Sequence, residues 1–402
     1  MAPTPSLPLA HVTVLDLSRV LAGPFATMVL AELGATVLKV EAPGEGDETR
    51  GFEPFVERGG ESVSAYFLSC NRSKRSVTAN FRDPDGREVI RDLARQVDVV
   101  VENFPVGSLA KYGLDYASLR AINPTIVYLS CTGFGQTGPY AGLKGYDTIF
   151  QAMGGMLGLT GEAGGGPVKP GLPVADLSSG LWAASAVLAA LVGRQHTGQG
   201  CHIDLSMFDA QVSWLTVAAA RFFARQEVPP RLGTEHPGRV PSASLRTTDG
   251  WIHVSASDQH WPALCRVLGL DDLGADPSLA TNAGRLARRA DVMQRLAAAV
   301  ATRERDELWM ALAGAGVPAG PVRALDEVLH DPHVRARGLV DSFVHPQVGP
   351  FPALRVPLVF DGWDRATLGA PPRLGEDTDH VLASRLGYTA ERIAELRRKG
   401  AI

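Results

Sequence analysis

Short apolar runs alternate with segments of helical spacing along the first third of the chain. The runs that predict buried strands are residues 12–17, 36–40, 97–101 and 126–130. Residues 23–33 and 87–96 have the spacing of helices, and the first of these segments opens with Gly-Pro. Strands that alternate with helices are typical of an α/β fold, so we expect a doubly wound parallel sheet.

The pattern continues to residue 225 and then changes. An Ala-rich helix over 177–191, a strand over 202–205 and one long helix over 207–225 extend the first part. Residues 227–241 are polar and rich in Pro, Gly and Arg, which is typical of a linker. Beyond this linker we expect a strand at 251–254 and helices at 258–269, 285–301 and 304–314.

These segments divide the chain into three stretches. We expect residues 1–225 to form the first part of a large Rossmann-like domain. Residues 226–330 contain the linkers and a smaller α+β middle domain, and residues 331–402 return to the large domain. A chain of 402 residues is too long for one ordinary core, which agrees with two domains.

Composition narrows the class of protein. The chain is 45% hydrophobic and 20% charged, as globular proteins are, and its formal net charge of −4 predicts no affinity for nucleic acid or for an anionic membrane. The four cysteines lie far apart without a CxxC pair, which favours reduced thiols. The N-terminus lacks the pattern of a signal peptide, and no run reaches the ~18 apolar residues of a membrane helix. We expect a cytoplasmic protein.

Several common kinds of site are disfavoured. Residues 18–24 depart from the GxGxxG pattern, which argues against NAD or FAD. His330 and His333 have no third ligand nearby in sequence, so we expect no metal site. No GxSxG elbow occurs. The basic run 72–75, together with Arg82, is either a phosphate clamp or a solvated face.

Asp176 stands out because it follows an apolar stretch punctuated by Pro and Gly and comes directly before the helix predicted at 177–191. Asp is a favoured helix N-cap, and that interpretation needs no further function. A carboxylate here can also act as a nucleophile that forms a covalent intermediate. Residue types alone leave both interpretations open.

Six motifs occur in a fixed order along the chain. They are VLDLSRVLAGP (14–24), LGATVLKVE (33–41), NRSKRS (71–76), VENF (101–104), GFGQTGP with GYD (133–139 and 145–147) and PVADLSSG (173–180). Together they resemble the family III CoA-transferases of the CaiB/BaiF type, over essentially the whole chain. The segments RVLAGPFATM (19–28) and RLGTEH (231–236) look most like the succinyl-CoA:glutarate group of that family.

The resemblance implies that Asp176 is the catalytic nucleophile. In the family scheme it attacks a donor acyl-CoA to give an aspartyl anhydride, the CoA thiolate then forms an aspartyl-CoA thioester, and an acceptor acid reverses the steps. The implied donor is succinyl-CoA, and the implied acceptor is a short dicarboxylate such as glutarate, malate, citramalate or mesaconate. The CoA thioester is a substrate, so no tightly bound cofactor is implied.

The resemblance also places residues around the CoA. The implied contacts are Val20, Leu21, Ala79, Asn80, Phe81, Arg82, Asn103, Phe104, Lys111, Lys144 and Tyr146. Each has an ordinary alternative, since the aromatic rings could pack in a core and the lysines could lie in solvent. A distal carboxylate favours an Arg partner, for which the candidates are Arg19, Arg50 and Arg239. Relatives carry a basic residue where this chain has Ala42, so a phosphate that relatives bind there is either unbound here or bound by the run 72–75.

Two other functions share much of this pattern. The α-methylacyl-CoA racemases resemble the chain at Asp176 but need a His where it has Tyr146, and a phenol with a pKa near 10 accepts protons poorly at neutral pH. A non-catalytic CoA-binding protein would keep the pocket without turnover. The first alternative predicts proton exchange at the α-carbon, and the second predicts no covalent adduct.

The resemblance also bears on how the active site closes and on how the chain assembles. The family's four-glycine lid has no counterpart, so the Gly-rich segments 133–145 and 161–166 are either covering loops or ordinary surface loops. Relatives form interlaced homodimers, and the linker at 227–241 is compatible with that arrangement.

Overall fold

The computed structural model describes residues 7–402, which form two compact units. The first unit runs to Met156, resumes over Lys169–Phe223 and takes up Arg335–Ile402. The second unit consists of Leu157–Val168 and Ala224–Val334. Each unit has its own hydrophobic core.

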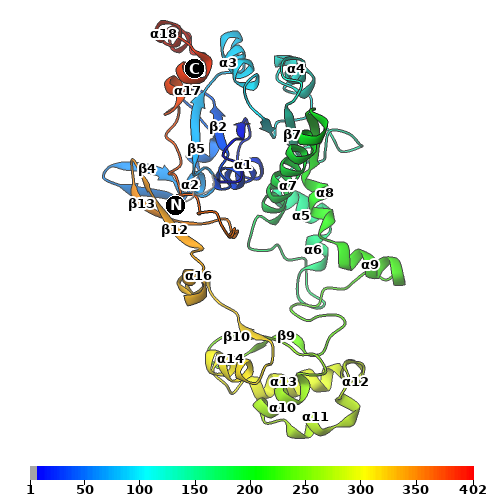
Figure 1. Ribbon diagram of the computed structural model, residues 1–402. Helices are drawn as coiled ribbons and strands as arrows, with labels where there is room; N and C mark the ends of the chain where they lie inside the picture. The colour runs from blue at the N-terminus through cyan, green and yellow to red at the C-terminus, as the bar shows by residue number, and fades with distance from the viewer. Residues whose placement is uncertain (1–6) are drawn as a thin grey trace. The chain divides into compact units, whose positions relative to one another are not determined.

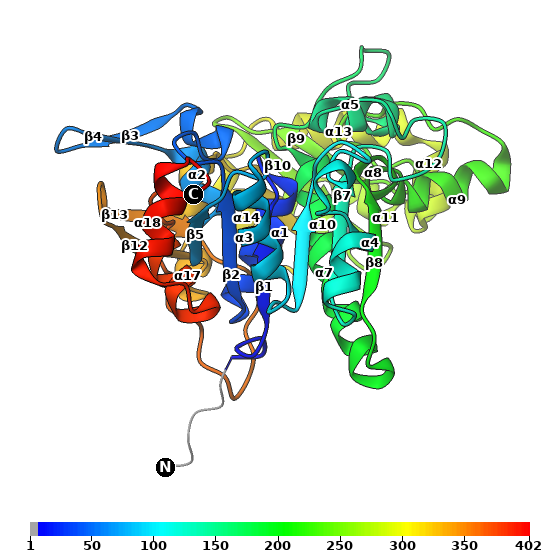
Figure 2. The same cartoon turned by 90° about the horizontal axis from the view of Figure 1, so that it is seen from above.

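A six-stranded parallel sheet organises the first unit, in the order β5-β2-β1-β6-β7-β8. Figure 2 shows these strands side by side. Their bounds are Thr13–Asp16 (β1), Thr36–Glu41 (β2), Lys74–Thr78 (β5), Val99–Glu102 (β6), Val127–Thr132 (β7) and Cys201–Ser206 (β8). The predicted α/β fold with a central parallel sheet is confirmed, and β5 is a strand that the sequence analysis did not predict.

Successive side chains of the central strands enter two different cores, because neighbours along a strand point to opposite faces. Val14 and Val37 face α1 (Ala22–Glu32) and α7 (Val174–Thr197). Leu15 and Leu38 face the other layer. That layer contains α3 (Pro84–Ala94), α4 (Tyr116–Ile122), α17 (Thr378–Leu386) and α18 (Ala390–Arg398). Helices therefore cover both faces of the sheet (Figure 1).

Helix α7 is a core helix with an unusually apolar sequence. Five of its buried residues follow one row at helical spacing, Ala175, Ser179, Ala183, Val187 and Leu191. They pack against α1, β7 and β8. Among the described residues it is the one helix long and apolar enough to cross a membrane, and 44% of that apolar window is buried in the fold. This packing accounts for the apolar residues on the buried face of α7.

The predicted long helix over 207–225 is wrong, because the structure has two helices there. Helix α8 covers Met207–Ser213 and α9 covers Thr216–Arg225. The amides of Trp214 and Leu215 donate to the carbonyls of Gln211 and Val212, which closes a tight turn and ends α8.

Smaller elements complete the first unit. They are the hairpin β3 (Phe55–Arg58) with β4 (Glu61–Ser64), the helices α2 (Ala65–Cys70) and α5 (Asp147–Met153), and the hairpin β12 (Val340–His345) with β13 (Gly349–Leu354). The end of the chain joins this unit directly, since the carbonyl of Ala401 accepts the amide of Asn80.

The second unit is a small α+β fold. An antiparallel sheet of β9 (Ser242–Arg246), β10 (Trp251–Ser255) and β11 (Ala319–Pro321) packs against α10 (Trp261–Leu268), α13 (Arg289–Val300) and α14 (Arg305–Gly314). The shorter helices are α11 (Asp271–Ala275), α12 (Asn282–Ala287) and α15 (Leu325–His330). The Gly-rich segment 157–168 belongs to this unit because Arg231 donates to the carbonyls of Gly158 and Gly165.

Candidate active site

Asp176 lies inside the first turn of α7, and a second carboxylate caps that turn. The N-cap position is Pro173, which has no side-chain capping bond. Asp147, the first residue of α5, instead accepts the amides of Ala175 at 2.9 Å and Asp176 at 3.2 Å through one oxygen. The interpretation of Asp176 as the helix N-cap is therefore wrong, because the carboxylate that caps α7 is that of Asp147.

The surroundings of Asp176 make its carboxyl group unusually basic. Burial raises the pKa of Asp176 to about 7, and the negative charge of Asp147 adds to the effect. A helix N-terminus by itself would lower this pKa, so burial prevails over the helix dipole. Near neutral pH the carboxyl group of Asp176 therefore changes between its protonated and ionised forms, in a partly buried environment. A pKa shifted in this way is common among catalytic groups.

Close packing of α7 on α1 fixes the direction in which Asp176 points. A Cβ atom at Gly180 would lie 2.8 Å from the carbonyl oxygen of Ala22 and 2.8 Å from the Phe25 ring. Asp176 lies one helical turn before Gly180 and on the same face. It therefore faces the turn that leads into α1, where Val20 and Leu21 lie.

Tyr66 of α2 is a site residue that the sequence analysis missed. It packs in one small cluster with Val20, Leu21 and Leu177, the neighbour of Asp176. Burial raises the pKa of the Tyr66 phenol, and the charge of Asp176 raises it further. No motif marked this residue, because only the fold brings α2 to the start of α7.

A cavity of about 390 Å³ opens at the carboxyl ends of β1, β2 and β6. This edge is where ligands of open α/β sheets bind. Six of the residues implied as CoA contacts line it: Ala79, Asn80, Phe81, Arg82, Phe104 and Lys111. The rings of Phe81 and Phe104 meet edge to face with their centroids 5.4 Å apart. The guanidinium of Arg19 lies 4.8 Å above Phe104. Aromatic faces beside cations suit an adenine with attached phosphates.

The other implied CoA contacts lie outside the residues that line the cavity. Tyr146 is 79% exposed and directly precedes Asp147, and Lys144 is exposed beside it. The side-chain amide of Asn103 binds the backbone of Arg19, because it donates to the Arg19 carbonyl and accepts the Arg19 amide N–H. Two groups of residues result, one around the cavity and one around Asp176.

Comparison with known proteins decides the family. The family model described as CoA-transferase family III matches residues 9–378. The chain belongs to CoA-transferase family III. It is 40% identical over 380 residues to the succinate–glutarate CoA-transferase of Agrobacterium fabrum, which covers 94% of this chain and 95% of that protein. It is 38% identical over 339 residues to the succinyl-CoA:mesaconate CoA-transferase of Haloarcula hispanica, with coverages of 83% and 85%.

A solved structure agrees with this assignment. The crystal structure of a CAIB/BAIF family protein from Brucella suis is 42% identical to this chain with a TM-score of 0.86, and it covers 95% of this chain and 100% of that one. The predicted family and the predicted enzyme class, a CoA-transferase, are both confirmed.

The three arginines suggested for a distal carboxylate have different positions in the transferase. Arg50 is already engaged, because Glu41 accepts its Nε and Nη2 at 2.7 Å each and its guanidinium stacks 3.8 Å above Phe67. That pairing argues against Arg50 as the substrate partner. Arg19 is exposed at the cavity, and Arg239 is exposed in the second unit.

The transferase does not use its Asn-Arg-Ser-Lys run as a phosphate clamp at Arg72 and Lys74. Arg72 is 3% exposed and pairs with Glu32, and Lys74 is 5% exposed and pairs with Asp16 at 3.0 Å. The suggestion that these two side chains bind a phosphate in place of residue 42 is therefore wrong. Arg75 is exposed on β5. Over residues 7–402 no group of three or more His, Cys, Asp or Glu could hold a metal ion.

Proposed function

We propose that this transferase moves CoA from succinyl-CoA to a short dicarboxylate, with Asp176 as the nucleophile. The activities named for the relatives support the substrate class, since one acts on succinate and glutarate and another on succinyl-CoA and mesaconate. The position of Asp176 carries the proposal. It is a partly buried carboxylate with a pKa of about 7 that faces the turn into α1.

The reaction balances without a redox step or a metal. A carboxylate oxygen of Asp176 attacks the succinyl carbonyl of succinyl-CoA. The C–S bond breaks and the CoA thiolate departs, so that an aspartyl–succinyl anhydride forms. The thiolate then attacks the side-chain carbonyl of Asp176, which releases succinate and leaves an aspartyl-CoA thioester. The acceptor carboxylate attacks the same carbonyl and expels the CoA thiolate, which gives an aspartyl–acceptor anhydride. The thiolate then attacks the acceptor acyl carbonyl of this anhydride, and the acyl C–O bond to Asp176 breaks, which forms the acceptor CoA thioester and frees the Asp176 carboxylate.

Each end of the CoA has residues suited to it. In the proposal Phe81 and Phe104 hold the adenine, and Arg82 and Lys111 neutralise phosphates at the cavity. Val20, Leu21, Lys144 and Tyr146 contact the thioester end, because the turn and the start of α5 both adjoin the first turn of α7. Ala79, Asn80 and Asn103 shape the path between them.

Acceptor choice rests on a cation for the distal carboxylate. Arg19 and Arg239 are the exposed candidates among the three suggested arginines. Changing the correct one to Met should raise the KM for glutarate and leave the KM for succinyl-CoA nearly unchanged. An unaltered acceptor preference removes that residue from the proposal.

We also infer a homodimer, interlaced as in the family that the sequence resembles. Large apolar side chains are exposed along α7 to α9, among them Leu181, Trp182, Trp214, Val217 and Phe223. A hollow of about 430 Å³ lies between Trp182 and Trp214. A second copy of the chain would cover this surface. Sedimentation that gives a monomer at all dilutions would contradict the dimer.

The function is tested with a panel of dicarboxylates against succinyl-CoA. We expect wild-type protein to form the acceptor thioester, with short dicarboxylates preferred, and Asp176→Asn to lose at least about 10³-fold in kcat. A folded Asp176→Asn protein with full activity would refute the nucleophile. Exchange of α-protons with deuterated solvent, without CoA transfer, would instead favour the racemase chemistry.

A further inference from the structure

The turn between β1 and α1 contains a strained residue. Val20 has a φ angle of 70°, in the left-handed region. A β-branched residue is a genuine outlier there, and such strain persists only where surrounding contacts enforce it. Val20 lies in the turn that Asp176 faces. The contacts that enforce its conformation therefore also shape the surroundings of Asp176.

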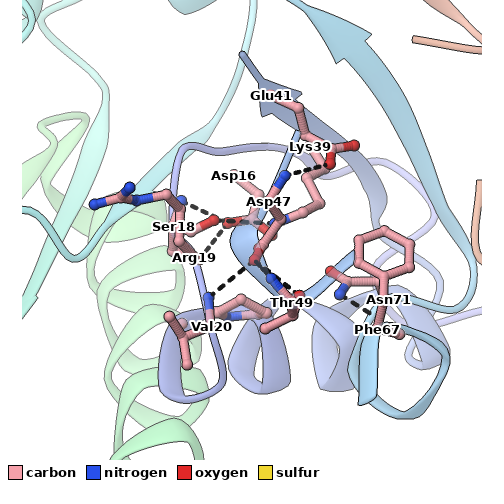
Figure 3. Close-up of polar contacts among 12 residues, drawn as sticks. Asp16, Ser18, Arg19, Val20, Lys39, Glu41, Asp47, Thr49, Phe67 and Asn71 are labelled. Atoms are coloured by element: carbon pink, nitrogen blue, oxygen red, sulfur yellow. Dashed lines mark hydrogen bonds and ion pairs between the residues drawn. The ribbon is translucent and has the colours of Figure 1, made fainter. Parts of the chain in front are cut away.

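Buried side chains hold the polar backbone groups of this turn one by one (Figure 3). Asp16 accepts the amide of Ser18 at 3.0 Å, and Lys39 donates to the carbonyl of Ser18 at 3.0 Å. Asp47 accepts the amide of Val20 at 3.4 Å. Between them, Asn103 binds both polar groups of residue 19. Side chains from other segments therefore fix the backbone of the turn at residues 18, 19 and 20.

Lys39 and Asp47 form the centre of this arrangement. Their side chains are 0% exposed and pair at 2.8 Å. The second Asp47 oxygen, which receives the Val20 amide, also accepts the amide and hydroxyl of Thr49. The Asp47 amide is in turn accepted by Glu41. Contacts with Lys39, Glu41 and Thr49 thus fix the orientation of Asp47 independently of its bond to the turn.

A buried ion pair of this kind is weak evidence for stability. Removing two charges from water costs as much as their attraction returns, and apolar replacements are often as stable. The directional contacts that both residues make to the turn give a different reason for their presence. They end at Val20, which packs with Tyr66 and with Leu177 beside the nucleophile.

We propose that Lys39 and Asp47 are positioning residues of the transfer reaction. They hold Val20 in its left-handed conformation, and the turn in that conformation forms the wall against which the thioester meets Asp176. Neither residue touches the reacting atoms. The inference rests on the proposed function at Asp176.

A double-mutant cycle with residue 20 tests this role, because glycine adopts a φ of 70° without strain and alanine does not. Val20→Gly and Val20→Ala remove nearly the same side chain and form a matched pair. Asp47→Asn should lower kcat by about 10- to 100-fold in the Val20→Ala background, as a displaced reactant does. In the Val20→Gly background the same change should cost less than about threefold. Equal losses in the two backgrounds would overturn the proposal.

A second variant covers the case in which Asp47→Asn does not fold. Lys39→Met combined with Asp47→Leu removes both charges and leaves no unpaired ion. We expect it to remain folded, with a stability lowered by the backbone groups that lose their partners, and still to lose kcat, with recovery on Val20→Gly. Wild-type activity in this variant would also overturn the proposal.

The result stays separable from the proposed function. Failure of wild-type protein to form an Asp176 adduct with succinyl-CoA would refute the nucleophile itself. A normal adduct with a kcat that is indifferent to residues 39 and 47 would refute only the positioning role.

Discussion

At the scale of single residues, the pKa of Asp176 follows from its burial and from its neighbour Asp147. The amides at the start of α7 are taken by Asp147, so they do not stabilise the charge of Asp176. Burial and the Asp147 charge then raise the pKa of Asp176 to about 7. The sequence placed Asp176 at a helix start, but it gave no sign that a residue 29 positions earlier would cap that helix.

This pKa predicts a pH profile. The value of kcat/KM for succinyl-CoA should rise with pH through an apparent pKa near 7, because the nucleophile must be ionised. Asp147→Asn removes a negative charge, so the rising limb should move to lower pH. Burial also raises the pKa of Glu102 to about 7, and Glu102→Gln is therefore the control that should leave the limb in place. A limb that follows Glu102 instead would contradict the assignment.

The same pKa predicts a pH-dependent stability. The folded protein binds a proton at Asp176 between pH 4 and 7 that the unfolded chain does not bind, so stability from this group is greatest at low pH and falls as pH rises through 7. Asp176→Asn should therefore stabilise the protein by about 2 kcal/mol at pH 8, with allowance for partial exposure. The gain should vanish at pH 4 in thermal unfolding. An equal effect at both pH values would argue against the raised pKa.

At the scale of elements, the packing of α7 on α1 determines where Asp176 lies. The glycine in the PVADLSSG motif has a direct physical role, because Gly180 contacts the backbone of Ala22. Strand positions were predictable from short apolar runs, since buried parallel strands are nearly continuous in hydrophobicity. Strand β5 was not, because the buried charge of Lys74 depends on its pairing with Asp16, which is distant in sequence.

A single methyl group on α7 tests this packing. Gly180→Ala should push α7 away from α1, lower the stability by about 1–3 kcal/mol and lower kcat by about 10- to 100-fold. Gly193→Ala on the same helix is the control, since a Cβ there meets nothing within 4 Å. It should be neutral or stabilising by up to about 1 kcal/mol. Similar kinetics for the two variants would show that contact with α1 does not position Asp176.

At the scale of the whole molecule, the order of the sheet explains why three motifs that are scattered along the sequence line one cavity. Parallel strands end at one edge, so the segments after β1, β2 and β6 meet around the cavity. This much followed from the sequence once the strands were assigned. The buried network around Lys39 and Asp47 did not, because ion pairs between remote segments leave no periodic trace.

Binding of the CoA thioester at this edge should depend on its cations. Arg82→Met is expected to raise the KM for succinyl-CoA about tenfold with little change in kcat, since Arg82 lines the cavity and the proposal gives it one charge-assisted contact to phosphate. Arg95→Met removes the same charge from α3, where Arg95 pairs with Glu88 and Asp92. That control should leave the KM unchanged at physiological salt. Equal shifts in both variants would indicate general electrostatics rather than a phosphate site.

The most direct measurement is the capture of the covalent intermediate. Protein mixed with succinyl-CoA, without an acceptor, is treated with hydroxylamine and digested for peptide mass spectrometry. The account predicts a hydroxamate on the peptide that carries Asp176, absent when succinyl-CoA is omitted and absent in Asp176→Asn. An active wild-type enzyme whose Asp176 stays unmodified, or whose adduct forms on another residue, would contradict it.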